Sequence, residues 1–125
     1  MSVKAIAKNV RMSPRKVNEV AALVRGRTVA EALVILDHVP RRAAQPVRKT
    51  VASAKANAIK NHNFKEDGLY IEQIFVNAGA RFKRYRPAAH GRALPFIRRS
   101  SNVYVIVNGE QRPAKKPATT KKEAK

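Results

Sequence analysis

Residues 69–108 read LYIEQIFVNAGARFKRYRPAAHGRALPFIRRSSNVYVIVN, and this stretch decides which fold the chain takes. Its two ends, residues 69–77 and 102–108, are rich in β-branched and aromatic residues, which favour strands. The middle, residues 78–101, has no helical periodicity. It is also longer than the ~12–15 residues that loops of compact domains rarely exceed. We therefore predict two strands joined by an extended, functional segment.

The extended segment carries charge of one sign. Residues 73–109 contain no Asp or Glu. A solvated protein face normally mixes both signs, and a long stretch of one sign repels itself, so the pattern indicates a polyanion-binding element. Arginine predominates, and its planar fork suits bidentate phosphate contacts and stacking on bases. The bases of this segment are Arg81, Lys83, Arg84, Arg86, Arg92, Arg98 and Arg99.

Two basic-aromatic arms flank a turn within this segment. Residues 81–87 alternate bases with aromatic rings, residues 94–99 mirror them, and Gly91 lies midway, where it can take the positive φ of a tight turn. This pattern predicts a two-armed β-ribbon of about ten residues per arm, roughly 30 Å long at ~3.3 Å per residue. Because an isolated hairpin is marginal in water, we expect a basic one to be ordered by its partner.

Three aromatic residues of the ribbon, Phe82, Tyr85 and Phe96, are candidates for stacking on unpaired bases. For Phe82 and Phe96, stacking on each other across the ribbon is an equal alternative. For Tyr85, which is nearest the tip, we favour stacking on a base of the bound nucleic acid.

Two helices are predicted upstream of the ribbon. Ser13 and Pro14 begin the first, and Gly26 ends it. Thr28 and Glu31 form a capping box that begins the second, which ends near residue 38. The apolar stripes of the two helices are Val17, Val20, Ala21 and Val24, then Val29, Ala32, Leu33 and Leu36.

A third helix is expected to begin at Pro40, and residues 3–10 read as an N-terminal strand. Pro46 would stand at the seventh position of this helix, where it costs ~3 kcal/mol. We therefore expect a kink there, or a helix whose regular part begins near Pro46. Gly68 closes the loop that follows. The small-residue seam of the helix is Ala44, Val47, Val51, Ala54 and Ala58.

The whole chain has 125 residues and a net charge of +19, which fits one domain with a polyanionic partner. Nucleic acid is the leading candidate for this partner. Acidic lipid is a weaker candidate, because no basic helix has a bulky aromatic face. We expect no membrane segment, and the absence of Cys suits a reducing compartment. The domain is predicted over residues 1–111, including the hairpin 78–101. Residues 112–125 form a basic tail that is expected to be disordered alone.

Catalysis finds little support in the chain. His38, His62 and His90 are far apart, Glu66 and Asp67 are adjacent in an expected loop, and there is no phosphate-binding glycine motif. We expect no enzyme, no cofactor, no metal and no small-molecule substrate.

Several motifs together resemble the large-subunit ribosomal protein L-twenty-two family of bacterial type. They are MSPRKV (12–17), VRGR (24–27), EAL (31–33), SAKANA (53–58) with His62, and YIEQIFV (70–76), followed by Lys83-Arg84, Arg86-Pro87, Gly91-Arg-Ala93 and Arg98-Arg99. They stand in family order over residues 3–107.

This resemblance implies an α+β fold in which three helices pack on a three-stranded antiparallel sheet and a long β-hairpin protrudes. It implies a cytoplasmic structural constituent of the large ribosomal subunit that binds large-subunit (23S-type) rRNA and aids its assembly. The hairpin would line the nascent-polypeptide exit tunnel, beside ribosomal protein L-four and the nascent chain in transit.

The resemblance also assigns residues. On the RNA-facing side of the domain it places Arg11, Ser13, Arg15, Lys16, Arg25 and Arg27. At the tip and tunnel wall it places Lys83, Arg84, Tyr85, Arg86, Pro87, Ala88, Ala89, His90, Gly91 and Arg92. Ala88 and His90 stand where the family usually has Arg and Lys, so the tip is less charged than the family pattern.

Two rival functions remain. A histone-like DNA architectural protein also inserts basic β-ribbons into nucleic acid, and composition does not exclude it. An RNA-processing enzyme would show a cluster of perturbed titratable groups in a pocket, for which the sequence gives no sign.

Overall fold

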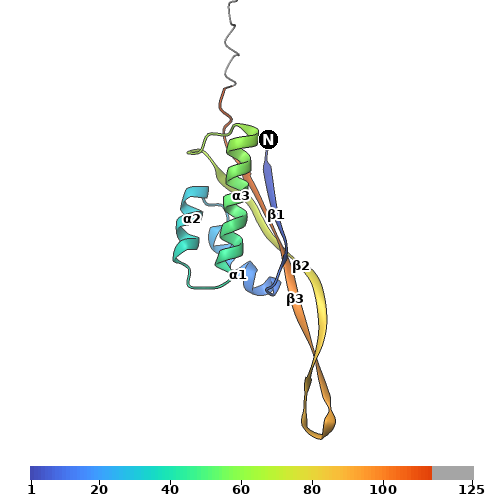
Figure 1. Ribbon diagram of the computed structural model, residues 1–125. Helices are drawn as coiled ribbons and strands as arrows, with labels where there is room; N and C mark the ends of the chain where they lie inside the picture. The colour runs from blue at the N-terminus through green and yellow to red at the C-terminus, as the bar shows by residue number, and fades with distance from the viewer. Residues whose placement is uncertain (114–125) are drawn as a thin grey trace, which may run out of the picture.

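The computed structural model describes residues 1–113, so nearly all of the predicted tail 112–125 lies outside the described residues. The described part is an α+β domain with a three-stranded antiparallel sheet of order β1-β3-β2 and a long β2–β3 hairpin that projects from it (Figure 1). The predicted fold class is confirmed. The elements are β1 (Val3–Val10), α1 (Pro14–Val24), α2 (Val29–His38), α3 (Ala44–His62), β2 (Tyr70–Pro87), the 3₁₀ turn η1 (Ala89–Gly91) and β3 (Ala93–Asn108).

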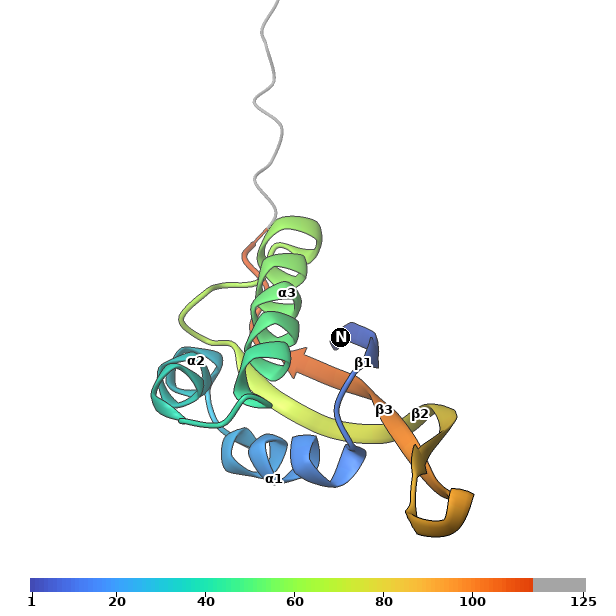
Figure 2. The same cartoon turned by 60° about the horizontal axis from the view of Figure 1, so that its bottom comes forward.

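The sheet is buried on the face that the helices cover. Along the central strand β3, Val103, Val105 and Val107 are fully buried, whereas the intervening Tyr104 and Ile106 are half-buried. This alternation is what the two-residue period of a strand with one covered face requires. In Figure 2, α1 lies beside the strands near the base of the ribbon, and α2 is the helix farthest from the sheet.

The first two helices begin and end as predicted. Ser13 precedes α1 and Pro14 is its first residue, although the Ser13 hydroxyl makes no capping hydrogen bond. Gly26 follows α1 with a φ of 75°. The Thr28 hydroxyl accepts the Glu31 N–H at 3.4 Å, which confirms the capping box. Their apolar stripes are buried, except that Leu33 is only partly so.

The third helix begins later than predicted. The expectation that Pro40 starts it was wrong, because α3 begins at Ala44. Pro46 therefore falls in the first turn, where N–H groups have no acceptor within the helix and a proline loses no bond. The alternative, a helix that begins near Pro46, is confirmed, and the whole predicted seam is buried. The helix ends at Asn63, whose φ of 54° closes it ahead of Gly68.

The ribbon and the two flanking strands form one pair of long strands. Pairing continues from Arg81 opposite Arg99 to Pro87 opposite Ala93, well beyond the end of β1 (Figure 1). The two-armed ribbon is thus confirmed, and the separate strands predicted at 69–77 and 102–108 were too short. Its need for a partner stays a prediction.

The tip is closed by a five-residue turn. The Ala88 N–H donates to the Arg92 carbonyl at 2.8 Å. Gly91 takes the expected positive φ, at 70°. His90 also has a positive φ, 61°, which the sequence did not predict. Two consecutive left-handed residues reverse the chain within this short turn.

The ribbon leaves the sheet at a junction with two bulges. Both edge strands shift register next to Ser101 of β3: β1 between Ala7 and Val10, opposite Asn102, and β2 between Ala78 and Arg81, opposite Ser100. Bulges bend a strand and increase its twist, so this level sets the direction of the ribbon. Gly79 lies inside the β2 bulge, and a Cβ there would come within 2.7 Å of the Ser100 hydroxyl oxygen.

Replacing Gly79 by Ala is expected to lower the free energy of unfolding by about 1–3 kcal/mol, the usual cost of overpacking. The Ser100 hydroxyl has little freedom to yield, because it donates to the Ala80 carbonyl at 2.6 Å. Urea titration measures the change. In the control Gly68→Ala the nearest atom is 3.9 Å away, so we expect a change within ~0.5 kcal/mol. Equal stability of the two variants would contradict the close approach at Gly79.

The ribbon of the free protein is expected to exchange its amide protons at least about a hundredfold faster than the buried residues of β3, because a two-stranded ribbon has little independent stability. Hydrogen exchange followed by NMR on the full chain measures this difference. Binding of a structured RNA should then slow exchange in the ribbon. Protection of residues 82–97 equal to that of Val105 in the free protein would contradict the prediction.

Candidate nucleic-acid interface

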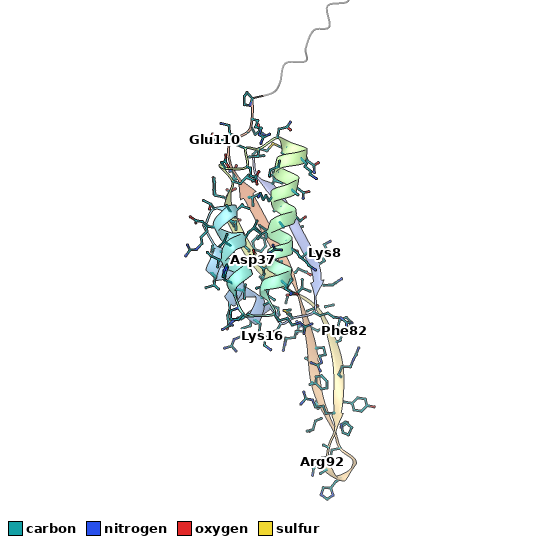
Figure 3. All side chains as sticks on the ribbon, turned by 60° about the vertical axis from the view of Figure 1, so that its left-hand side comes forward. Lys8, Lys16, Asp37, Phe82, Arg92 and Glu110 are labelled. Carbon is teal, nitrogen blue, oxygen red and sulfur yellow. The ribbon has the colours of Figure 1, made fainter. Side chains whose placement is uncertain are left out.

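A basic groove of about 1050 Å³ lies where the ribbon meets the body. It is lined by the loop before α1 and the start of that helix, by the α2–α3 loop, and by β3 of the ribbon. In Figure 3, Lys16 lies beside the base of the ribbon. The groove brings together six predicted residues from two distant parts of the chain: Arg11, Ser13, Arg15, Lys16, Arg98 and Arg99.

Two bases in the groove were missed. Arg41 and Arg42 line it and also line a second groove of about 640 Å³ between α2 and α3. The sequence held a usable signal, since cations just before a helix oppose its dipole and are there at a cost in stability.

Arg25 and Arg27 do not join the groove. Arg25 donates from Nη2 to the Ile74 carbonyl at 3.2 Å, which ties the end of α1 to β2. Arg27 donates from Nε to the Leu23 carbonyl at 3.1 Å, which satisfies a free carbonyl in the last turn of α1. Both side chains therefore form hydrogen bonds that stabilise the domain. Their predicted contact with RNA stays a prediction.

Glu19 is the one acidic residue among those that line the groove at the ribbon base. Its carboxylate forms an ion pair with Arg41, and both side chains are more than half exposed. This ion pair links Arg41, in the α2–α3 loop, to Glu19 of α1. It also places a negative charge where the surrounding groups are cationic.

The strand register divides the ribbon into two faces. Opposite residues of an antiparallel pair point to the same side, and successive residues alternate. Arg81, Lys83 and Tyr85 therefore share one face with Arg99 and Ile97. The other face, called the arginine–aromatic face below, carries Phe82, Arg84, Arg86, Leu94, Phe96 and Arg98.

The aromatic rings of the ribbon do not stack on one another. Phe82 lies opposite Arg98 and Phe96 opposite Arg84, so stacking of these two rings across the ribbon was wrong. Each ring instead lies beside an arginine, with the Arg84 guanidinium carbon 5.7 Å from the centre of Phe82. Tyr85 lies on the opposite face and is 71% exposed. Base stacking by all three stays a prediction, but they do not share one face.

Acidic partners are found on the body rather than on the ribbon. Within residues 1–113 the ion pairs use Glu19, Asp37, Glu66 and Glu110. The Lys55 ammonium group lies 2.6 Å from the Glu66 carboxylate and hydrogen-bonds to it, which holds the pKa of Glu66 below its ordinary value. Glu110 lies at the end of the body away from the ribbon (Figure 3). The ribbon cations are thus left for an external partner.

Residues 1–113 contain no cluster of three His, Asp or Glu side chains placed to hold a metal ion. None of the described helices combines the length and apolar character needed to cross a bilayer.

The fold and its surface define a class: a small, strongly basic α+β domain that presents its charge in a groove and along a projecting ribbon. The family model described as ribosomal protein L22p/L17e matches residues 5–108. The chain therefore belongs to the ribosomal protein L22p/L17e family.

Curated relatives match almost the whole domain. A large ribosomal subunit protein uL22 of Mesoplasma florum is 44% identical over 111 residues, which are 89% of this chain and 99% of the relative. Proteins of the same name from Oceanobacillus iheyensis and Clostridioides difficile are 48% and 49% identical over 107 residues. Those matches cover 86% of this chain and 95% and 96% of the relatives.

Replacing Glu19 by Gln is expected to raise affinity for structured RNA about twofold to fivefold, in keeping with the size of exposed charge interactions. The substitution removes a negative charge that competes with phosphate for Arg41. Filter binding at fixed salt measures the change. The matched control is Glu110→Gln, whose carboxylate pairs with Lys65 at 3.2 Å outside the groove and should have no effect. Weaker RNA binding by the Glu19 variant would contradict binding of RNA phosphates in the groove.

Proposed function

We propose that the chain is a structural, non-catalytic constituent of the large ribosomal subunit that binds large-subunit rRNA and aids its assembly. The observation that carries the proposal is the continuity of the basic groove with an acid-free ribbon, so that cations run unbroken from the body outward. Membership of a ribosomal protein family supports the choice of RNA over other polyanions.

Binding would rest on phosphate contacts. Arg and Lys side chains neutralise RNA phosphates and release condensed counterions, which makes affinity fall with salt. Such contacts fix position, whereas recognition of RNA depends mainly on its shape and on unpaired loops. The groove would hold RNA against α1 and the α2–α3 loop, while the ribbon reaches RNA segments that the body is too broad to enter.

The ribbon would also line the nascent-polypeptide exit tunnel. The tip residues, from Pro87 through Gly91, are exposed or half-buried and include no Lys, Arg, Asp or Glu. A weakly charged tip at the end of a cationic stem suits contact with passing polypeptide. Ribosomal protein L-four would be the neighbouring protein at this point, and the assembled subunit would lie in the cytoplasm.

Sedimentation tests the proposal directly. A tagged full-length chain should migrate with large ribosomal subunits in a magnesium-containing gradient and stay bound through a wash at moderate salt. Equal affinity for duplex DNA and for large-subunit rRNA, with no migration alongside subunits, would overturn it in favour of a DNA architectural protein.

Replacing the four ribbon bases Lys83, Arg84, Arg86 and Arg92 by Ala should weaken rRNA binding and reduce the slope of log affinity against log salt by about three, since each lost phosphate contact removes ~0.7–0.9. The unfolding transition of the body should not change, because none of these side chains lies in the core. A charge-matched control replaces Lys4, Lys8, Lys49 and Lys60, none of which lines the groove at the ribbon base. An unchanged slope in the ribbon variant would contradict RNA binding by the ribbon.

A further inference from the structure

Phe96 is the one aromatic ring of residues 1–113 that has two guanidinium groups over it. The Arg86 guanidinium carbon lies 4.8 Å from the centre of the Phe96 ring, and that of Arg98 lies 5.1 Å from it. The register explains both contacts. Arg98 is two residues along the same strand, and Arg86 is diagonally across on the partner strand, so all three are on the arginine–aromatic face.

Phe96 is half-buried although it lies in the ribbon. Between residues 80 and 99 every side chain is exposed except Ala88 in the turn and Phe96, which are half-buried. The helices cover the sheet and not the ribbon (Figure 1). A guanidinium group over an aromatic face is attracted by the negative face of the ring and keeps its plane fixed. Phe96 therefore serves as a platform that holds the guanidinium groups of Arg86 and Arg98 in place.

The guanidinium N–H groups of Arg86 and Arg98 are left without a partner in residues 1–113. Within residues 1–113, neither Arg86 nor Arg98 makes a side-chain hydrogen bond or an ion pair. Arg84 differs, because its Nη1 donates to the neighbouring Lys83 carbonyl at 2.8 Å. Two like charges beside one ring also repel each other, and no acid in residues 73–109 offsets that repulsion. A single anion bound between them would offset it.

We propose that Arg86, Phe96 and Arg98 form a phosphate clamp, in which both guanidinium groups bind one backbone phosphate of RNA and Phe96 positions them. This inference rests on the proposed function and names the group within it that binds. Planar forks give bidentate phosphate contacts that a lysine ammonium does not reproduce. Phe96 is a positioning residue, because it acts through the arginines.

The first experiment measures affinity for large-subunit rRNA by filter binding with the full chain. Arg86→Lys and Arg98→Lys keep the charge and should each lower affinity about fivefold or more, because the stacked fork is lost. Arg48→Lys, on the body, where Arg48 pairs with Asp37, should change it less than about twofold. Phe96→Leu should lower affinity about fivefold, and Phe96→Tyr, which keeps the ring, should stay within about twofold of the wild type.

A double-mutant cycle separates positioning from simple contact. With Leu at position 96, the Arg86→Lys exchange should cost less than about twofold, because the fork is no longer held. The matched cycle of Phe96 with Arg48 should be additive. Equal costs of Arg86→Lys in both backgrounds would overturn the clamp even if the wild-type chain binds rRNA well.

A second measurement does not depend on rRNA. In the full chain, titration with inorganic phosphate should shift the Nε–Hε NMR signals of Arg86 and Arg98 together. It should leave that of Arg48, whose Nε pairs with Asp37, nearly unchanged. Phe96→Leu should abolish the joint shift. If these shifts occur but rRNA is not bound, the proposed function fails and the clamp stands. If phosphate moves the three arginines alike, the clamp is overturned.

Discussion

The structure depends on strand β3, which belongs both to the three-stranded sheet of the body and to the two-stranded ribbon. Over residues 101–107, β3 is the central strand of a three-stranded sheet, and Val103, Val105 and Val107 seal the core beneath the helices. Farther toward its start it pairs with β2 alone and forms one arm of the ribbon. Because the strand is continuous, the body fixes the direction of the ribbon, and the register fixes which side chains share each of its faces. The bulges on either side of the Ser101 pairs set the angle between the body and the ribbon.

Charge is distributed to match this division. The acids pair with bases on the body, as Glu66 does with Lys55, whereas the ribbon has cations and no acid in reach. Exposed ion pairs of this kind add little stability each, so the body relies on its buried valines and alanines. The groove at the ribbon base is where the two parts meet, and there Glu19 is the single acid among many bases. Binding strength would therefore be gained at the ribbon and groove without placing unpaired charge in the core.

Local signals predicted the elements well and their connections less well. The capping box at Thr28, the stop at Gly26 and the turn at Gly91 depend on neighbouring residues, and each lies where the sequence indicated. The start of α3 was misplaced because Pro40 and Pro46 both fit a first helical turn, and only packing of Ala44 into the core decides between them. The basic ribbon was found from its missing acids. Arg41 and Arg42 were not, since their loop reaches the groove only through the packing of α2 and α3 against α1.

By itself the sequence determined the positions of most helices and strands and the presence of a cationic ribbon, because periodicity, capping and charge are properties of nearby residues. The fold class followed from the resemblance to the L-twenty-two family and not from these local patterns. The tertiary structure alone decided which predicted residues act together. It joined Arg25 and Arg27 by hydrogen bonds to backbone carbonyls of the domain and brought Arg11 and Arg99 into one groove. It also separated Tyr85 from Phe82 and Phe96. The reason is that strand register and helix packing bring together residues far apart in the chain, and no local pattern specifies that alignment.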